Sequence, residues 1–443
     1  MKDISFFEYG GFELNGEEDY SLSSLPMTED QKKYLCSLSE TLLQNKRIFS
    51  IDQKTIKANS IVGSISFENV RVEIMPKILK YNSGNRSDII RNLMFMLSYT
   101  NQLDVSDANI NSMSHDYDSF IEAYISIFAN RLLKHLRMYG SPKSYIEKEE
   151  NLNTLKGRVI FSKQSSLNCF DQSKVFCEFS EFSENNKLSK AFKFVAWSLS
   201  KLTKNSSSLT VLGRCYGILD GVNSEYISPN DLNFVQVGKR DNNFLALINL
   251  TKMFLQKMRP DFSGNKSVKV FSLLFDMNEL FEEFIYQILK RNSSRLEIEV
   301  SAQKKKRLVS EERDFLVQSH WSPKYLFDTF TDIAIIPKIG RSFIIDTKYK
   351  IVSTSKSHYG ISNQDAYQVL AYRQIHSTQN GSPAVALIYP LSDFKMKKEF
   401  KITSSDTTFF AWTVDISRNL QNELHKVLDE LQELIGIAIK SNS

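Results

Sequence analysis

The chain has 443 residues, with 56 lysines and arginines against 51 aspartates and glutamates, giving a formal net charge of +5. This length allows about two to four domains, and the weak positive charge does not by itself predict nucleic-acid binding. The four cysteines are scattered without a C-x-x-C pair, which argues against a disulfide framework or zinc site and is typical of a reducing cytosol. No apolar run reaches about 18 residues and residues 1–10 lack an apolar stretch, so we expect a cytoplasmic protein without a transmembrane helix or signal peptide.

Residues 1–85 are predicted to form a β-rich module. The sequence indicates one helix over 28–45, which begins with residues suited to an N-cap. Apolar residues alternate over 60–67 and again over 70–77, which predicts the two strands of a β-hairpin. Nothing in this module has a catalytic signature.

Residues 86–260 are predicted to form a mixed α/β middle region. Apolar residues at helical spacing indicate helices over 88–100, 119–139 and 186–203. The polar cluster from Lys204 to Ser208 reads as a loop.

The segment from Pro260 to Ser267 is polar and rich in helix breakers, so the last domain boundary is placed there. It contains Gly-x-Lys-Ser, but the spacing of a phosphate-binding loop is absent, because Arg259 stands where the first glycine should be and Asn265 separates Gly264 from the lysine. The sequence contains no other nucleotide-cradling loop. Any nucleotide-driven step would therefore need another subunit.

The third region, residues 261–443, is predicted to begin with a helix over 270–290. Glu282 lies at the edge of its apolar stripe, next to Ile285 and Leu289. It is therefore the acid on this helix best placed to reach a site at a sheet. A solvent-exposed helix carboxylate is the alternative.

The densest basic run of the chain is Lys304-Lys305-Lys306-Arg307, which follows a predicted strand over 296–301. Four adjacent cations suit contact with a phosphate backbone. They are equally common in an exposed turn, so the sequence leaves both interpretations open.

Residues 331–350 predict a β-hairpin that has charged residues where a core hairpin would be apolar. A three-residue turn at 339–341 would place Asp332 opposite Lys348, with Asp346 two residues along on the same face. Two converging carboxylates suit a hard divalent cation such as Mg²⁺, and a neighbouring lysine can orient water or stabilise charge on phosphate. The pattern indicates metal-assisted phosphodiester hydrolysis, and three surface charges paired in solvent are the alternative.

A helix is predicted to begin at Ser362, where Ser362-Asn363-Gln364-Asp365 fits a variant capping box. Gln368 and Tyr372 lie one turn apart on the face that contains Asp365. Capping explains Asp365 alone, so Gln368 and Tyr372 become candidate site residues. The remaining predicted elements are strands over 384–389 and 409–415 and a closing helix over 416–439.

The hairpin resembles the signature of the PD-(D/E)xK nuclease superfamily, with Asp332, Asp346 and Lys348 at its motif positions. The segment from Val268 to Pro390 further resembles the McrC family, the nuclease subunit of McrBC modification-dependent restriction systems. Gln368 and Tyr372 are also similar to the Q-x-x-x-Y helix of RecB-type nucleases. The resemblance to the McrC family rests on four collinear blocks, which are residues 273–282, Asp332, residues 345–350 and residues 365–372.

This resemblance implies a Mg²⁺-dependent DNA endonuclease of phage defence, with Mn²⁺ as a substitute cation, double-stranded DNA as substrate and no membrane association. It implies an α+β fold with an N-terminal β-rich module, a mixed helical middle region and a C-terminal PD-(D/E)xK domain whose mixed central sheet is flanked by helices. The partner would be a McrB-like hexameric AAA+ GTPase, bound through residues 1–85. The alternatives are a non-catalytic activator of an AAA+ ring and a stand-alone RecB-like nuclease.

The site residues that we predict fall into three groups. The catalytic residues are Asp332, Asp346, Lys348 and Gln368. The metal ligands are Asp332, Asp346, the Thr347 carbonyl and Glu282, and the nucleic-acid contacts are Lys304, Lys305, Lys306, Arg307 and Tyr372.

Overall fold

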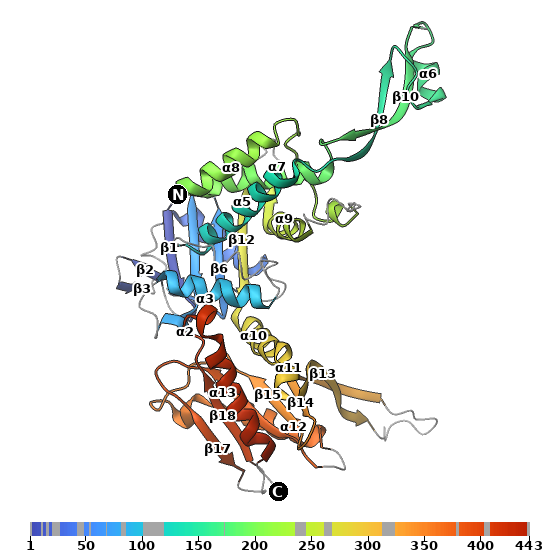
Figure 1. The fold of residues 1–443 in the computed structure, drawn as a ribbon. Helices are drawn as coiled ribbons and strands as arrows, with labels where there is room; N and C mark the ends of the chain where they lie inside the picture. Colours follow the sequence, from blue (N-terminus) through green and yellow to red (C-terminus); the bar gives the residue numbers. More distant parts are fainter. Residues whose placement is uncertain are drawn as a thin grey trace, which may run out of the picture. The chain divides into compact units, whose positions relative to one another are not determined.

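The computed structural model describes an α+β protein, as predicted (Figure 1). It divides into two compact units that interleave along the chain, so the three sequence regions proposed above stay a prediction. Unit 1 contains Ile65–Arg71 and Ser119–Leu273, and unit 2 contains Asp3–Ser64, Val72–Asp118 and Leu274–Ser443. The described residues are 2–9, 12–14, 17–19, 27–41, 48–52, 55–67, 69–80, 86–100, 119–171, 173–234, 245–260, 268–311, 324–377, 381–402 and 408–440.

The N-terminal part of the chain is built on a β-sheet in which β6, β7, β1, β2 and β3 are neighbours in that order. Every residue of β6 and β7 is buried, and the two strands confirm the ones predicted over 60–67 and 70–77. The strands are β1 (Lys2–Phe7), β2 (Phe12–Leu14), β3 (Glu17–Asp19), β4 (Phe49–Asp52), β5 (Thr55–Ala58), β6 (Ile61–Phe67) and β7 (Val70–Met75). The helices are α1 (Glu29–Thr41), α2 (Lys77–Lys80) and α3 (Arg86–Tyr99).

Unit 1 packs helices α5 (Phe120–Tyr139), α7 (Lys187–Leu202), α8 (Ser206–Ile218) and α9 (Leu245–Lys257) together. The predicted helices over 119–139 and 186–203 are confirmed by α5 and α7. The loop predicted at Lys204 to Ser208 is wrong from Ser206 onward, where α8 begins, and Asn205 caps this helix by accepting a hydrogen bond from the Ser208 amide. The polar residues from Asn205 to Ser208 that suggested a loop form the N-cap and first turn of this helix.

A long β-hairpin extends from these helices (Figure 1) and is called the arm, residues 144–183. Its strands β8 (Ser144–Leu152) and β10 (Val175–Ser183) pair antiparallel along their whole length, with β9 (Arg158–Val159) and helix α6 (Phe161–Leu167) between them in sequence. Several large apolar side chains on the arm are exposed, and the most exposed are Phe170 at 100%, Phe161 at 77% and Tyr145 at 75%. The sequence did not predict this hairpin.

Unit 2 contains a mixed six-stranded sheet of order β13-β14-β15-β16-β18-β17, which confirms the predicted mixed sheet. The strands β15 and β16 pair parallel, as do β16 and β18, whereas the other neighbours pair antiparallel. Every residue of β16 is buried, because helices cover both faces of the sheet centre. The strands are β13 (Ile298–Glu311), β14 (Lys324–Pro337), β15 (Phe343–Thr347), β16 (Ala384–Pro390), β17 (Lys397–Lys401) and β18 (Thr408–Val414).

The helices that pack on this sheet are α10 (Met277–Arg291), α12 (Asn363–Ile375) and α13 (Leu420–Lys440) (Figure 1). The helix predicted over 270–290 is wrong in its first part, since Val268–Asp276 forms strand β12, which pairs with β11 (Met258–Pro260). An apolar run of this length fits a buried strand as well as a helix, and periodicity cannot separate the two. Asp276 marks the change by capping α10 through the Asn278 amide.

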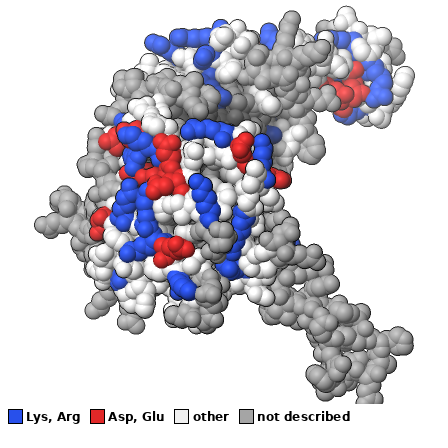
Figure 2. All heavy atoms as spheres, turned by 60° about the horizontal axis from the view of Figure 1, so that its bottom comes forward, with Lys and Arg blue, Asp and Glu red and all other residues white. Residues whose placement is uncertain are grey.

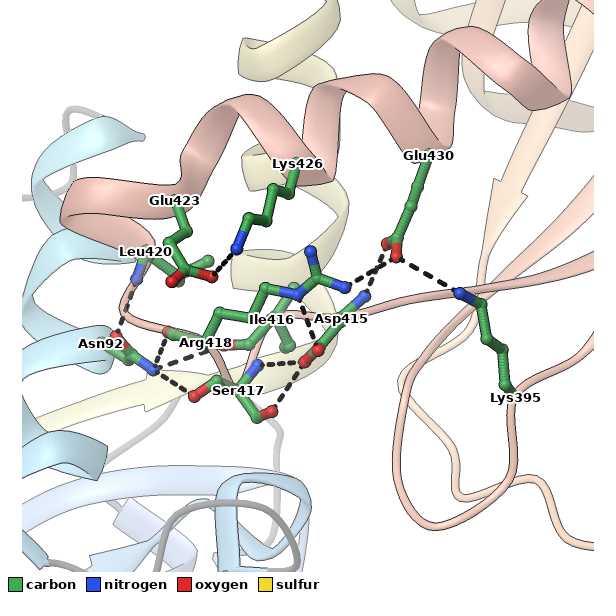
Figure 3. Close-up of polar contacts among 10 residues, drawn as sticks. All are labelled: Asn92, Lys395, Asp415, Ile416, Ser417, Arg418, Leu420, Glu423, Lys426 and Glu430. Atoms are coloured by element: carbon green, nitrogen blue, oxygen red, sulfur yellow. Dashed lines mark hydrogen bonds and ion pairs between the residues drawn. The ribbon is translucent and has the colours of Figure 1, made fainter.

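Helix α13 is fixed at its start by a polar cluster (Figure 3). The Asn92 side chain of α3 donates to the carbonyls of Ser417 and Arg418, at 3.1 and 2.7 Å, and accepts from the Leu420 amide. The Arg418 guanidinium pairs with Asp415 and with Glu430 of α13, at 2.7 and 3.0 Å. These bonds hold the loop that sets the direction of α13 across the sheet. Among the described helices, none is long and apolar enough to cross a membrane.

Candidate active site

Asp332 and Asp346 lie opposite each other on the adjacent strands β14 and β15. The observed register pairs Ile333 with Ile345, so it differs by two residues from the predicted one, which placed Asp332 opposite Lys348. The reason is the turn, because β14 ends at Pro337 and β15 begins at Phe343, which leaves a connection longer than the predicted three residues. The shift brings the two carboxylates closer than the sequence indicated.

The Asp332 carboxylate is half-buried and held by the end of β15. Its Oδ2 accepts hydrogen bonds from the amide and the hydroxyl of Thr347, at 2.8 and 2.9 Å. These two bonds fix the orientation of the carboxylate. They also fix the backbone of Thr347, whose carbonyl is a predicted metal ligand.

Asp346 is fully buried, and its Oδ2 lies 2.7 Å from the Lys348 Nζ. Its Oδ1 is also buried and has no hydrogen-bond partner. A buried carboxylate oxygen without a donor is unfavourable in a folded protein unless something else binds it. The arrangement therefore leaves one acceptor available for a cation.

Lys348 is held by a chain of hydrogen bonds through helix α12. Its Nζ donates to the Gln368 Oε1 at 3.0 Å, and the Gln368 Nε2 donates to the Tyr372 hydroxyl at 2.6 Å. The hydroxyl donates to the Phe330 carbonyl at 2.8 Å, which leaves its lone pairs to accept from the amide. This sequence of donors and acceptors sets the direction of the Gln368 amide and points its oxygen at the lysine.

Helix α12 begins at a capping box that the sequence predicted. Ser362 and Asp365 cap each other reciprocally, and the Lys350 Nζ lies 3.0 Å from both carboxylate oxygens of Asp365. Lys350 follows Lys348 by two residues, so this ion pair ties the start of α12 to the same segment that provides the site lysine.

Glu282 on α10 is half-buried beside these groups, and its Oε1 accepts a hydrogen bond from the Gln303 side chain at 2.7 Å. Burial, and then the charge of Asp332, raises the pKa of Glu282 to about 7. The charge of Asp346 also raises this pKa, which shows that Glu282 is close enough to both aspartates to sense them electrostatically. The prediction that Glu282 is the acid of α10 nearest to the sheet site is consistent with this position.

Both aspartates are also harder to ionise than a free side chain. Burial, and then the neighbouring Asp332 charge, raises the pKa of Asp346 to about 7. Burial raises the pKa of Asp332 as well, against the lowering effect of the Thr347 hydrogen bonds and Lys348. Three carboxyl groups that resist ionisation at one place form an environment that a divalent cation would stabilise.

The residues fit a cation that keeps much of its hydration. Among the described residues, no three His, Cys, Asp or Glu side chains stand close enough to hold a metal ion together. Mg²⁺ is commonly bound by one or two carboxylates with water molecules completing its shell. Asp332 and Asp346 supply that pair, and the unpartnered Oδ1 of Asp346 is the specific feature that fits the ion.

The predicted nucleic-acid contacts differ in how accessible their side chains are. Lys305 is exposed on β13, and its Nζ lies 5.8 Å from the centre of the Phe330 ring across the strand pair. The side chains of Lys304, Lys306 and Arg307 lie outside the described residues. Tyr372 is only 1% exposed, so its side chain offers DNA little surface, and its hydrogen bonds give it a positioning role instead.

The surface charge agrees with the weak net charge of the chain. Figure 2 shows Lys and Arg side chains recurring across one face of the molecule, with Asp and Glu side chains among them. That face therefore has no broad stripe of a single sign. DNA binding has to be argued from local groups such as Lys305.

A family model described as "McrBC 5-methylcytosine restriction system component" matches residues 56–390 of the chain. The chain belongs to the McrC family. A similar fold occurs in a chain of a refined half-complex from a tetradecameric assembly of Thermococcus gammatolerans McrB AAA+ hexamers with bound McrC. The TM-score is 0.66 and the sequence identity 17%, over 96% of this chain and 100% of that one.

A chain of the Thermococcus gammatolerans McrBC complex also matches this McrC-family protein. The TM-score is 0.50 and the identity 19%, over 66% of this chain and 88% of the other. No curated protein sequence matches. At these identities the two solved structures support the fold, and the match to the family model extends across the residues of the candidate site.

Sequence reasoning missed two partners of the McrC-family site. One is Gln303 of β13, which has a backbone φ of 52° and donates a side-chain hydrogen bond to Glu282. The other is the Phe330 carbonyl, at which the chain of hydrogen bonds from Lys348 ends. A backbone carbonyl has no sequence signal. Gln303 directly precedes the basic run, but nothing in its surroundings distinguished it from a surface residue.

Proposed function

We propose that this chain is the DNA-cleaving subunit of a McrBC-type restriction system, and that it hydrolyses phosphodiester bonds with Mg²⁺ or Mn²⁺. The observation that supports this most directly is the fully buried Asp346, which has an unpartnered oxygen and stands beside Lys348 and opposite Asp332. Charges that merely pair in solvent, the alternative left by the sequence, would not bury one carboxylate completely. The six-stranded sheet with this site then represents the PD-(D/E)xK nuclease domain.

In the proposed reaction, Asp332 and Asp346 would hold the divalent cation, with the Thr347 carbonyl as a further ligand. Glu282, the fourth predicted ligand, does not stand close enough to the two aspartates to share the ion directly, so it would bind a water of the cation's shell. The cation supplies Lewis-acid activation of the phosphate and of a bound water. The Lys348 ammonium would donate a hydrogen bond to the attacking water or to the phosphate oxygen on which charge develops. Gln368 keeps that ammonium directed at the site through the 3.0 Å bond to its Oε1.

The partner that we propose is a McrB-like hexameric AAA+ GTPase. Two observations support this: the fold is similar to chains solved together with McrB, and the sequence lacks a phosphate-binding loop of its own. Of the described segments, the arm is the one best suited to reach into another protein, since Phe170 is fully exposed near its tip. We therefore propose that unit 1 contacts the partner through the arm. The contact through residues 1–85 also stays a prediction.

The nuclease proposal is tested by cleavage of supercoiled plasmid DNA with Mg²⁺, GTP and the purified partner. We expect the wild-type chain to cut and Asp346→Asn to lose cutting while it still binds the partner and stimulates GTP hydrolysis. The matched control is Asp429→Asn, an exposed aspartate on α13, which should cut normally.

The outcomes separate the three functions considered. Wild-type protein that stimulates hydrolysis without cutting would favour the non-catalytic activator. Cutting that needs no partner would favour a stand-alone nuclease. Loss of cutting, partner binding and stimulation together in the Asp346 variant would indicate misfolding.

The arm contact is tested by Phe170→Ser, with Leu209→Ser as a control at a half-exposed leucine of α8. We expect the first variant to reduce stimulation of GTP hydrolysis and the second to leave it unchanged. Equal stimulation by both variants would show that the arm tip does not contact the ring.

A further inference from the structure

The tyrosine that follows the site lysine is anchored by a residue from the far end of the sequence. Tyr349 is 4% exposed, and its hydroxyl donates to the Glu8 Oε1 at 2.7 Å. Glu8 is fully buried directly after strand β1, and both residues belong to unit 2. A residue of the N-terminal sheet thus bonds the segment that presents Lys348.

Glu8 is itself held from two sides, which makes it a rigid anchor. Its Oε1 also accepts from the Lys77 amide at 2.9 Å, and its own amide donates to the Met75 carbonyl at 3.0 Å. Tyr9, the next residue, donates its amide to the Ala58 carbonyl. Movement of Glu8 would therefore require movement of the β7 end and of the start of α2.

Tyr349 is placed where it can influence the site. Strand β15 ends at Thr347, and residues 348–350 lie outside regular structure, with the Lys348 amide bonded to the Ile388 carbonyl. Backbone pairing with β16 therefore fixes the chain only as far as the Lys348 amide, and beyond that point its path depends more on side-chain contacts. The Tyr349 ring also packs on Phe281, at 6.0 Å between ring centres, and Phe281 directly precedes Glu282.

Packing alone does not account for a carboxyl group at this place. The Glu8 Oε2 is buried without a hydrogen-bond partner, and burial raises the pKa of Glu8 to about 8, against hydrogen bonds from Tyr349 and Lys77 that lower it. An apolar side chain would avoid this desolvation but could not bond the tyrosine. What the carboxyl group provides in return is a directed bond to Tyr349.

We propose that Glu8 and Tyr349 form a positioning pair for the cleavage reaction, in which the N-terminal sheet fixes the backbone that aims Lys348. The inference rests on the proposed nuclease function. Neither residue contacts the substrate, so the pair acts through the geometry of the lysine and through the adjacent α10. Residues 1–85, assigned above to partner contact, would thereby bear directly on the rate of cleavage.

The test measures kcat and KM for plasmid cleavage, with partner, GTP and Mg²⁺, in Tyr349→Phe, Glu8→Leu, Glu8→Gln and the double variant of Glu8→Leu with Tyr349→Phe. The matched control is Tyr124→Phe, a buried tyrosine of unit 1 whose hydroxyl contacts the Met253 sulfur. We expect kcat to fall about tenfold in Tyr349→Phe and in Glu8→Leu with KM unchanged, since only alignment is lost. Glu8→Gln retains an acceptor and should keep most of the rate.

The double variant should fall no further than either single variant, because both remove the same bond. The inference would be overturned if Tyr349→Phe and Glu8→Leu cleaved as fast as the unmodified protein, or if their losses multiplied in the double variant. Cleavage by the unmodified protein would in that case still support the nuclease function. Absence of cleavage by the wild type would overturn both. If Glu8→Leu fails to fold, as judged by circular dichroism, Tyr349→Phe and Glu8→Gln decide the result.

Discussion

The burial of Asp346 predicts that the same substitution that abolishes cleavage stabilises the protein. In the metal-free folded state Asp346 keeps its proton up to about pH 7, whereas the unfolded chain releases it near the ordinary value of 3.8. The folded state therefore binds more protons between these values, so stability falls as pH rises through this window and stays lower above it. Asp346→Asn removes the titrating group and with it this loss.

The difference between 3.8 and about 7 corresponds to about 4 kcal/mol at pH 8, taken as an upper limit. Lys348 would lose its ionic partner in the variant, so we expect a net gain of about 1–3 kcal/mol. Differential scanning calorimetry in EDTA should show no gain at pH 4 and a melting temperature higher by a few degrees at pH 8. With Mg²⁺ the gain should shrink or reverse, because only the wild type binds the cation well.

Asp429→Asn is the control, since that carboxylate is exposed and should change the melting temperature little at either pH. An Asp346→Asn protein that melts below the wild type at pH 8 in EDTA would refute the reasoning. So would a stability difference that does not depend on pH.

Three further predictions concern neighbouring residues. Gln368→Leu removes the acceptor that holds Lys348 and should lower kcat about 10-fold to 100-fold. Tyr372→Phe removes only the hydroxyl that orients the Gln368 amide, so it should lower kcat less, and steady-state cleavage kinetics compare the two variants. Glu282→Gln should raise the Mg²⁺ concentration needed for half-maximal cleavage about tenfold, with Glu283→Gln as the control one residue along α10. Gly157→Ala should destabilise the arm, because Gly157 has a φ of +69° and a Cβ there would clash with the Glu178 carbonyl oxygen. Limited proteolysis should then cut the arm of the variant faster than that of the unmodified protein.

The predicted site residues that the structure brings together are those whose chemistry is visible in a short pattern. Asp332, the D-x-K of the hairpin and the pair Gln368 and Tyr372 all lie near one end of β15, and the capping box of α12 is present as predicted. The hairpin register was wrong by two residues. Turn length sets register, and the sequence at 338–342 has only Gly340 as a clear turn signal.

Other features depend on contacts between distant parts of the chain, which one sequence does not reveal. The arm was missed because β8 contains the charged run 147–150 rather than an apolar alternation. The charges of this run form ion pairs within the arm, Lys148 with Glu181 of β10 and Glu149 with Lys163 of α6. The start of α10 was misplaced because a buried strand and a buried helix share an apolar composition. The bond between Glu8 and Tyr349 joins residues 341 positions apart and has no local signal.

The end of β15 shows why the site needs so many distant partners. Thr347, Lys348, Tyr349 and Lys350 follow one another where strand pairing stops, and each is held by a side chain from another element: Asp332 of β14, Gln368 of α12, Glu8 after β1 and Asp365 of α12. Pairing of β14 with β15 places the two carboxylates opposite each other, but it cannot aim the lysine that lies beyond the end of β15. Separate anchors can do so, because each constrains one residue without constraining the next. Substitutions at these anchors should therefore reduce the rate of cleavage more than they reduce the stability of the fold, whereas substitutions at Ile333 or Ile345, which are fully buried beneath the site, should do the opposite.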